Sequence, residues 1–527
     1  MNNFDITQLS NNIIYNIFTC ISFKKRNIFC KNNKYLYNKF KQYKHQEIIK
    51  ISYSKYKLIN KWKNVKFEIE TNTLNTDFLY NLSNAYSVNL SWHRDKIINI
   101  DLLENVKVIN LSMCNKIKNL SKLKNLTELD ISHNKEIKNI PNLKNLRKLN
   151  ITKCPNLNYK TSLKNIQSLC LRECSEITDV TLFKNIKILD LSKCVNITDI
   201  KELKNVKNLN LSDCYKIKDV SMLSKVKYLN LSNCALITNV SKLTDVYSLN
   251  LSYCDNIKNV SQLGNTKYLN LSHCTLIANV SNLTDIYSLN LSYCYKIKNV
   301  SQLGNTKYLN LSHCPLITDV SDLKNVHTLN LSYCSNIRKV FYLTNVYNLN
   351  LSHCYKVRKI SKLKNTHILD LSYCDEIRNI SALKKVHTLN ISNCTKIINI
   401  SSLKKVTNLN LSGCIKISTL YELKNIYDID LSYTNIYDVS LLKNAYKINI
   451  TGCNITDVSM LGDVTVLNLT NCKYITDVSM LSNVRYLNIS GCHNIEDLSM
   501  LGDIYDFIYD DYDDDDDDGT CLYIDDY

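Results

Sequence analysis

Apolar residues recur in blocks of constant length along most of this chain. In the block from Val206 to Lys225, Leu209 and Leu211 flank a polar residue, which is the alternation of a half-buried strand. The residues that follow are apolar at every third position, and this spacing predicts a 3₁₀ or extended arc with one inward side chain per turn. About 14 residues separate successive strands, too few for a full helix and its connections. The pattern therefore predicts a row of strands opposite a thin, mostly non-helical side.

The column that contains Leu209 continues every 20 residues from Ile109 to Ile429, and a looser copy near residue 88 and three late copies bring the number of repeats to 21. A fixed period of roughly 20 to 29 residues with the core L-x-x-L-x-L-x-x-N/C is the signature of the leucine-rich repeat. Here the core reads V-x-x-L-x-L-x-x-C from Val206 to Cys214. We predict a leucine-rich-repeat solenoid with a parallel β-sheet on its concave face and a thin 3₁₀ or extended convex face, preceded by a small α-helical module.

The domain organisation follows from the extent of the repeats. A repeat array grows lengthwise because each copy packs only on its neighbours, so 527 residues need not form several globular domains. With only 8 Gly and 3 Pro, the chain has no linker of the usual flexible composition. We expect an F-box-like helical module at 1–43, a linker and degenerate capping repeat at 44–87, the repeats at 88–504, and a closing strand with a disordered acidic tail at 505–527.

The N-terminal module carries apolar residues at helical spacing. They resemble the first half of an F-box, which runs Leu-Pro-x-Glu-Ile, then Ile-Phe, then Leu, although Ser10 replaces the proline, Asn12 replaces the glutamate and the second half of the motif is missing or displaced. The resemblance implies docking on a Skp-type adaptor of a cullin–RING ubiquitin ligase. The alternative is a plain helical cap over the first strand edge. The matching residues, which would contact the adaptor, are Leu9, Ile13, Ile17, Phe18 and Ile21.

The repeats carry two further resemblances, which together cover about 80 per cent of the chain. The run from Cys194 to Asp199 resembles the cysteine-containing leucine-rich repeats that often accompany F-boxes, and the run from Ile475 to Leu481 resembles the arc of internalin-type repeats. Both imply the fold and leave the binding task open, because such repeats serve many functions. The chain is rich in Lys, Asn, Ile and Tyr, as expected of an A+T-rich genome such as that of a giant DNA virus or a protist.

The cysteines indicate a reducing compartment. Of 22 cysteines, 18 fall in one column of the repeat, which is typical of small buried residues and not of a secreted disulfide framework. Nearly every copy also contains an N-glycosylation sequon, and glycans there would cover the strands. The apolar run from Ile13 to Phe23 is too short to span a bilayer. We expect an intracellular protein, cytoplasmic or nuclear and in the host cell if viral, with no membrane partner.

The charge is unevenly distributed. The net charge is +18, yet the 12 acidic residues from Asp503 onward have no basic residue among them, which leaves +30 in the preceding chain. Lysines scattered over a solenoid usually form a solvated face, so we do not expect a nucleic-acid partner, although binding of nucleic acid through the basic body is a third, weaker hypothesis. The tail, with an unbroken run from Asp513 to Asp518, could fold over the basic solenoid and screen it, or could keep the final strand soluble.

Recognition is confined to a few positions of the repeat. Asn or Asp at position 210 and Ser at 212 are almost constant and are expected to form hydrogen-bonded ladders on the concave face, which leaves positions 208 and 213 to vary. Tyrosine and histidine alternate at position 213 and suit a protein interface. Duplication explains the alternation equally well, since residues 246–285 and 286–325 are nearly identical. The candidate partner-binding residues are Tyr253, His273, Tyr293, His313, Tyr333, His353 and Tyr373.

No arrangement of residues suggests catalysis. The sequence contains no Gly-rich phosphate loop, nucleophile elbow, HExxH or CxxC motif, so we expect neither an enzyme nor a metal or other cofactor. The first functional hypothesis is the substrate-receptor subunit of an SCF-type ubiquitin ligase, in which the N-terminal module binds a Skp-type adaptor and the repeats bind an unknown protein target. The alternative is a protein-interaction scaffold with no link to ubiquitin.

Overall fold

A computed structural model of the chain describes residues 48–52, 66–70, 82–83, 85–92, 100–158, 163–420, 423, 425–501 and 506–508. The chain divides into two compact units, Met1–Cys254 and Asp255–Tyr527. The five F-box-like residues, from Leu9 to Ile21, lie outside the described residues. Docking on an adaptor therefore stays a prediction.

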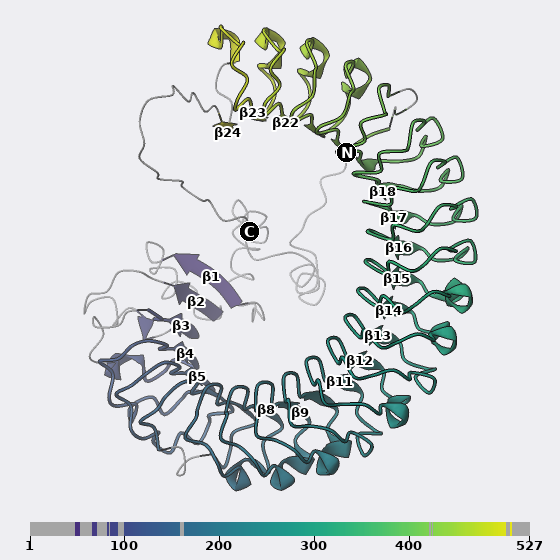
Figure 1. Cartoon of the computed structure of the whole chain (residues 1–527). Coiled ribbons are helices and arrows are strands. Elements are labelled where there is room, and N and C mark those ends of the chain that lie inside the picture. The colour runs from purple at the N-terminus through teal and green to yellow at the C-terminus, as the bar shows by residue number, and fades with distance from the viewer. Residues whose placement is uncertain are drawn as a thin grey trace, which may run out of the picture. The chain divides into compact units, whose positions relative to one another are not determined.

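The first unit is a stack of short parallel strands joined by turns and 3₁₀ helices (Figure 1). Each strand pairs with the strand of the next repeat in strict register, as Leu209 does with Leu229. Its described strands are β1 (Ile48–Ser52), β2 (Lys66–Glu70), β3 (Ser87–Asn89), β4 (Val108–Asn110), β5 (Glu128–Asp130), β6 (Lys148–Asn150), β7 (Ser168–Cys170), β8 (Ile188–Asp190), β9 (Asn208–Asn210), β10 (Tyr228–Asn230) and β11 (Ser248–Asn250). Its 3₁₀ helices are η3 (Asp101–Leu103), η5 (Thr181–Phe183), η6 (Lys201–Asn205) and η7 (Ser221–Lys225).

The second unit repeats this plan, and its strands also pair in parallel, for example Leu289 with Leu309. In Figure 1 the strands form the inner side of this unit and the 3₁₀ turns its outer side. Its described strands are β12 (Tyr268–Asn270), β13 (Ser288–Asn290), β14 (Tyr308–Asn310), β15 (Thr328–Asn330), β16 (Asn348–Asn350), β17 (Ile368–Asp370), β18 (Thr388–Asn390), β19 (Asn408–Asn410), β20 (Asp428–Asp430), β21 (Lys447–Asn449), β22 (Val466–Asn468), β23 (Tyr486–Asn488) and β24 (Asp506–Ile508). Its 3₁₀ helices are η8 (Ser261–Leu263), η9 (Ser301–Leu303), η10 (Ser321–Asn325), η11 (Ser440–Leu442), η12 (Ser459–Leu461), η13 (Ser479–Leu481) and η14 (Ser499–Leu501).

The hydrophobic core runs along the inside of each stack. In the repeat that begins at Val206, the predicted core residues Leu209, Leu211, Cys214 and Ile217 are all buried. Burial of one such leucine stabilises the folded state by about 1.5–3 kcal/mol, and each buried side chain packs on its equivalents in the next repeats. Over the described residues, the parallel sheet, the period of burial and the near absence of α-helix confirm the leucine-rich-repeat solenoid.

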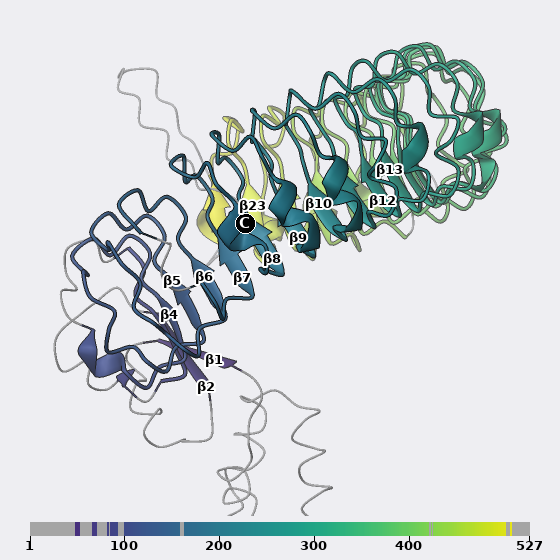
Figure 2. The same cartoon turned by 90° about the horizontal axis from the view of Figure 1, so that it is seen from below.

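The side opposite the sheet is thin because its hydrogen bonds span only three residues. The amide of Leu223 donates to the carbonyl of Val220 at 3.0 Å, and the amide of Val226 donates to the carbonyl of Leu223, also at 3.0 Å. These are 3₁₀ bonds, which place one buried side chain per turn as the spacing predicts. Figure 2 shows the resulting narrow loops side by side along each stack. Within the described ranges, no helix has the length and apolar character needed to cross a bilayer.

The cysteine column supplies buried hydrogen-bond donors. The Sγ of Cys214 donates to the carbonyl of Leu191 in the preceding repeat at 3.2 Å, and Cys234 donates to Leu211 at 3.1 Å. Burial raises the pKa of the Cys214 thiol to about 12, so the thiol stays protonated at neutral pH. The residue at this position thus packs as a small core side chain and satisfies a backbone carbonyl. In one repeat, Asn134 stands in place of the cysteine. Its Nδ2 donates to the carbonyl of Cys114 at 2.7 Å.

The expectation of hydrogen-bonded ladders at positions 210 and 212 is largely wrong. The Oδ1 of Asn210 accepts the backbone amide of Ser212 in its own repeat at 3.1 Å, and the same bond recurs in most copies. Such an Asx turn satisfies the amide locally and ends the strand. Bonds between side chains of neighbouring repeats also occur at these positions, as from Ser432 to Ser412 at 2.8 Å. Position 210 therefore shapes the turn that follows each strand.

Candidate protein-binding surface

The residue at position 213 lies in the turn just after each strand, at the edge of the sheet. Its backbone is left-handed in nearly every described copy, with φ of 61° at His273 and 62° at Tyr293. The ladder of the sheet enforces this conformation, because the amide of His273 donates to the carbonyl of Ser292 in the next repeat at 2.8 Å. Glycine adopts this conformation most easily, and it occupies the same position at Gly413, Gly452 and Gly491. A bulky residue here is held against its backbone preference.

In the second unit this turn position carries an unbroken stack of aromatic rings. Neighbouring ring centroids lie 4.0–4.3 Å apart and their planes are inclined by 10–14°. We call these six residues the His/Tyr stack. Its members, in order, are His273, Tyr293, His313, Tyr333, His353 and Tyr373.

The structure thus brings six of the seven candidate residues of the concave face into contact, at the edge of the sheet. Tyr253 occupies the equivalent turn in the first unit, where its φ is 60° and half of its side chain is exposed. The rings of the stack cover each other's faces, so the parts that reach solvent are ring edges, tyrosine hydroxyls and imidazole nitrogens. Tyr333 and Tyr373 are each 42% exposed, which leaves these polar edges open to a partner.

The histidines of the stack are held neutral. Burial against neighbouring rings lowers the pKa of His273 and His353, against the opposing effect of nearby aspartates. Burial also lowers the pKa of His313, and the two other histidines lower it further by charge repulsion. A neutral imidazole leaves one ring nitrogen as donor and the other as acceptor. The Nδ1 of His353 shares a hydrogen bond of 2.8 Å with the hydroxyl of Tyr355.

A second aromatic row, which the sequence interpretation missed, lies at the opposite edge of the same strands. It occupies position 207, just before each strand. His327 and Tyr347 stack with centroids 5.1 Å apart, Tyr347 and His367 at 4.5 Å, and His367 and His387 at 5.4 Å. We call these four residues the pre-strand row. The signal was present in the sequence, since histidine or tyrosine fills four successive copies of this column, from His327 to His387.

Lysines extend the pre-strand row toward the start of the second unit. Tyr287 contacts Tyr308 edge to face at 5.4 Å, and the Nζ of Lys307 lies 5.6–5.7 Å from both ring centroids. Lys267 approaches the other side of Tyr287 at 5.6 Å. Cation–π contacts of this kind are worth about 0.5–1 kcal/mol when exposed. They fix the orientation of the tyrosines and place positive charge beside them.

The sheet between the two rows is open and mostly neutral. At position 208 it presents Tyr268, Tyr308 and Ile368, each 37–40% exposed. The two rows are six positions apart in each repeat, at most about 20 Å if that stretch were fully extended. Five repeat steps at about 4.8 Å give about 24 Å in the other direction. We call this sheet with its two rows the aromatic surface. Its two dimensions give at most about 480 Å², roughly 60% of the ~800 Å² that each partner buries in a stable protein complex.

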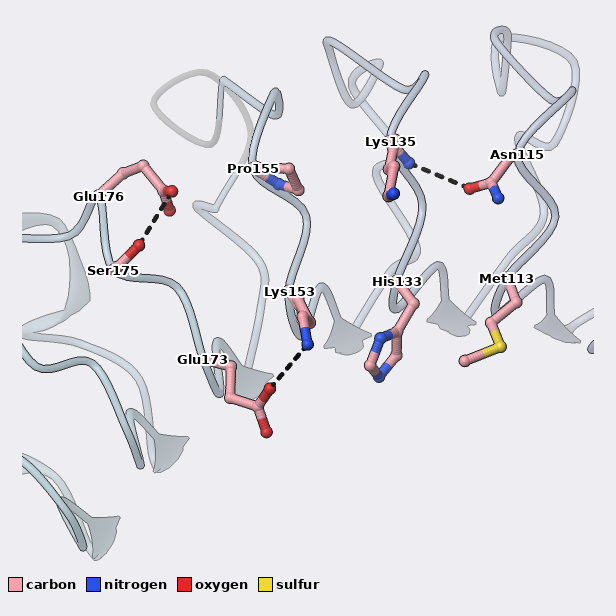
Figure 3. Close-up of a pocket in the computed structure, with 9 residues that line it drawn as sticks. All are labelled: Met113, Asn115, His133, Lys135, Lys153, Pro155, Glu173, Ser175 and Glu176. Atoms are coloured by element: carbon pink, nitrogen blue, oxygen red, sulfur yellow. Dashed lines mark hydrogen bonds and ion pairs between the residues drawn. The ribbon is translucent and has the colours of Figure 1, made fainter.

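The same turn positions in the first unit form a charged hollow of about 500 Å³ (Figure 3). Met113, His133, Lys153 and Glu173 follow one another along it at position 213. The Nζ of Lys153 lies 3.4 Å from Glu173, which Lys193 also approaches at 3.7 Å. Burial alone would raise the pKa of Glu173, but these lysines and Arg172 hold it below its usual range. Sequence reasoning did not single out this hollow, because no residue type repeats along it.

The described residues contain no group of three or more His, Cys, Asp or Glu side chains placed to hold a metal ion. The chemistry that the two units do offer is recognition. The first unit presents mixed charges along its turns, and the sheet of the second unit presents aromatic residues. A large neutral surface of tyrosine and histidine is the composition that protein interfaces favour.

Among known proteins, similarity to this chain is found only in solved structures, and it is low. No protein-family model matches the chain, and no curated protein sequence matches it. Among solved structures, internalin C2 of Listeria monocytogenes is 20% identical over 36% of this chain and 83% of its own, with a TM-score of 0.26. The internalin inlF of the same organism is 18% identical over 78% of this chain and 88% of its own, with a TM-score of 0.20. The mouse RP105/MD-1 complex is 16% identical over 78% of this chain and 86% of its own, with a TM-score of 0.47. The assignment of the fold rests on the repeat signature and the sheet, and this chain is similar to those proteins in its repeats alone.

Proposed function

We propose that this protein is a leucine-rich-repeat scaffold that binds a protein partner through the aromatic surface of its second unit. The observation that carries the proposal is the His/Tyr stack, whose six rings are aligned at 4.0–4.3 Å along one edge of the sheet. Tyrosine contributes large contact area with a polar tip and loses little conformational entropy on binding, the more so when neighbours already hold it.

The spacing of the rings argues against a nucleic-acid base as the ligand. A base that stacked between two rings would need them about 7 Å apart, and the repeat sets neighbouring strands only ~4.8 Å apart. The stack therefore offers its edges, which hydrogen-bond to side chains and to the backbone of a protein. We propose a role in binding without catalysis.

The test compares partner recovery by four forms of the full chain: the native chain, two variants and a control. In the first variant, Tyr293, Tyr333 and Tyr373 are each replaced by serine, and in the second, Ile368→Asp places a charge on the sheet and leaves both rows intact. The matched control replaces Tyr342, Tyr437 and Tyr474, which are 45–63% exposed outside the aromatic surface. We expect both variants to lose the partners that the native chain and the control retain. Equal recovery by all forms would refute the proposal.

A finer proposal is that the chain is the substrate receptor of an SCF-type ubiquitin ligase. Its support is the sequence resemblance between residues 9–21 and the first half of an F-box. The N-terminal module would bind a Skp-type adaptor, and other subunits would transfer ubiquitin to the protein held on the repeats. The buried thiols of the cysteine column suit a reducing compartment, the cytoplasm or nucleus, where such ligases act.

Purification with and without residues 1–43 separates this proposal from a scaffold with no ubiquitin link. A ligase subunit loses its adaptor on truncation and keeps its target. A scaffold with a helical cap recovers the same partners in both forms and shows lower stability of its first repeats. Absence of any Skp-type adaptor from the full-length sample would exclude the ligase and leave the scaffold in place.

A further inference from the structure

Positive charge is concentrated in a few successive repeats of the second unit. Residues 336–405 contain thirteen Lys and Arg against three acidic residues, a net charge of +10. By contrast, residues 255–335 carry six basic and four acidic residues, and residues 431–501 carry four basic and six acidic ones. We call the lysines and arginines of 336–405 the basic belt. All but one of them are exposed.

Within the belt, like charges lie side by side. Lys339 and Lys359 pair across neighbouring repeats in a parallel β-bridge on the side away from the sheet. Each follows an exposed arginine, Arg338 and Arg358, so two rows of cations run along the stack. Two unit charges at 4 Å repel by about 1 kcal/mol even in water, and like charges opposite each other on neighbouring strands are destabilising. Repulsion between the cations of the belt therefore destabilises the folded state.

The described residues of the belt offset little of this cost. Glu376 is already shared by Lys396, at 2.6 Å, and by Arg358, at 3.3 Å, and the hydrogen bond from Lys396 lowers its pKa. Two other lysines of the belt donate to amide oxygens: Lys356 to Asn336 at 2.6 Å and Lys385 to Asn365 at 3.1 Å. An amide oxygen satisfies the hydrogen bond without neutralising the charge. A polyanion on this surface would relieve the repulsion.

We propose that the acidic segment Asp510–Asp518 of this same chain binds the near end of the basic belt, where Lys384, Lys385 and Lys405 lie exposed in two successive loops. The segment contains eight aspartates and no basic residue. It follows β24, which pairs with β23 in the unit that carries the belt. Its charge is therefore opposite to that of the belt, and covalent attachment gives it an effective concentration in the millimolar range.

The length of chain restricts where the segment binds. Ten residues lead from Ile508 to Asp518, at most about 35 Å when extended. Five to six strand steps separate β24 from the loops of Lys384, Lys385 and Lys405, about 24–29 Å along the sheet. Nine steps separate β24 from the loop of Lys339, about 43 Å. The run Asp513–Asp518 reaches the near end of the belt and does not reach Lys339 of its own chain.

Zero-length carbodiimide cross-linking of the full chain, mapped by mass spectrometry, tests this directly, because it joins only carboxylates and amines in contact. We expect links from Asp513–Asp518 to Lys384, Lys385 and Lys405, and few to Lys339. The exposed lysines Lys443, Lys447 and Lys473 are closer to β24 along the chain but lie outside the belt, so they report non-specific contact. Links to these three that match or exceed those to the belt would overturn the proposal.

Three controls make the result specific. Raising the salt concentration from 0.05 to 0.5 M should lower the yield of belt links about tenfold, because screening shortens electrostatic range. Replacing Asp513–Asp518 by glutamate should preserve the links. In a mixture of ¹⁵N-labelled and unlabelled chains, we expect links within one isotopic form, and links between the two forms at equal frequency would show that the tail binds a second copy and would contradict the proposal.

Competition with an external polyanion gives an independent measurement. Replacing Asp513–Asp518 by asparagine should expose the belt, so this variant should bind single-stranded DNA at least about tenfold more tightly than the native chain at low salt. The same variant with Lys384, Lys385 and Lys405 also changed to serine should lose most of that gain. Equal DNA affinity of the native chain and the asparagine variant would show that the belt is not occupied by the tail.

Discussion

The imidazole of His313 lies 4.1 Å from the ring of Tyr293, with their planes inclined by only 10°. On its other face, His313 stacks on Tyr333 at 4.2 Å. One histidine is thus enclosed by two tyrosines from the repeats before and after it. The spacing of the repeats imposes this contact, and the first two predictions below follow from it.

The first prediction concerns the stability that the stack contributes. His313→Ala removes two ring contacts, each worth about 0.5–1.5 kcal/mol, so we expect the free energy of unfolding to fall by about 1–3 kcal/mol. His133→Ala is the matched control, because His133 occupies the same left-handed turn in the first unit between Met113 and Lys153. Urea denaturation followed by circular dichroism measures both. Equal losses would show that the stack adds nothing beyond the turn.

The second prediction is a loss of stability in mild acid. The pKa values of His273, His313 and His353 are lowered by burial in the folded state, so the unfolded chain binds more protons as the pH falls below about 6.5. Their neutral forms favour folding fully above that pH, and this contribution is lost progressively below it. Thermal melts between pH 7.5 and 5 should show this fall. Replacing the three histidines by glutamine should reduce it, and an unchanged pH profile in that variant would contradict the assignment.

The third prediction concerns two buried hydroxyls. The Oγ1 atoms of Thr306 and Thr366 are fully buried without a hydrogen-bond partner among the described residues, at a core position that valine fills in other repeats, as at Val326. Thr306→Val and Thr366→Val should each raise the free energy of unfolding by about 1 kcal/mol, because they remove a desolvated polar group without changing the volume.

Thr434→Val is the control for this pair of substitutions. The hydroxyl of Thr434 is also buried, but it donates to the carbonyl of Leu431 at 2.6 Å. Its removal should lower stability by about 1 kcal/mol. Chemical denaturation of all three variants settles the sign of each effect. A gain at Thr434 equal to that at Thr306 would show that the missing partner is not the cause.

The fourth prediction concerns thiol reactivity. Cys214 is fully buried and its pKa is raised to about 12. Burial also raises the pKa of Cys170, but this residue lies in a strand of the sheet and is partly exposed. Alkylation depends on the thiolate and on access. Peptide mapping after iodoacetamide treatment at pH 8 should show Cys170 modified well before Cys214. In denaturant the two should react at similar rates, and similar rates in the native chain would contradict the buried column.

The sequence period predicted the core because burial repeats with it. Leu209, Leu211 and Cys214 are buried in one copy and so are their equivalents in the others. The role of Asn210 was wrongly predicted, since a constant residue in a repeat can bond either to its neighbour copy or to its own turn, and periodicity does not distinguish the two. Local geometry decides the matter here, because the amide of Ser212 is only two residues away.

The arrangement of the aromatic surface was predicted in part. Alternation at position 213 pointed to the column of His313 and Tyr333, but stacking depends on the side-chain orientation that the left-handed turn imposes. The pre-strand row was missed because each of its residues precedes the strand, where the half-buried pattern had not yet begun. The adaptor-binding hypothesis rests on apolar positions between Leu9 and Ile21 that suit a helical cap equally well, so amphipathic spacing alone does not discriminate between them.

The left-handed turn also bears on how such a protein changes over generations. Its backbone is fixed by the amide that donates to the next repeat, as Tyr293 does to Ser312 at 2.9 Å, and not by the side chain that it carries. Replacement of that side chain therefore leaves the register of the neighbouring repeats unchanged. Copying one 40-residue block, such as 286–325, inserts one more tyrosine and one more histidine and lengthens the stack by about 8 Å without disturbing its neighbours. Unequal recombination between such blocks can lengthen or shorten the His/Tyr stack by two repeats at a time, and the core residues of the remaining repeats stay the same.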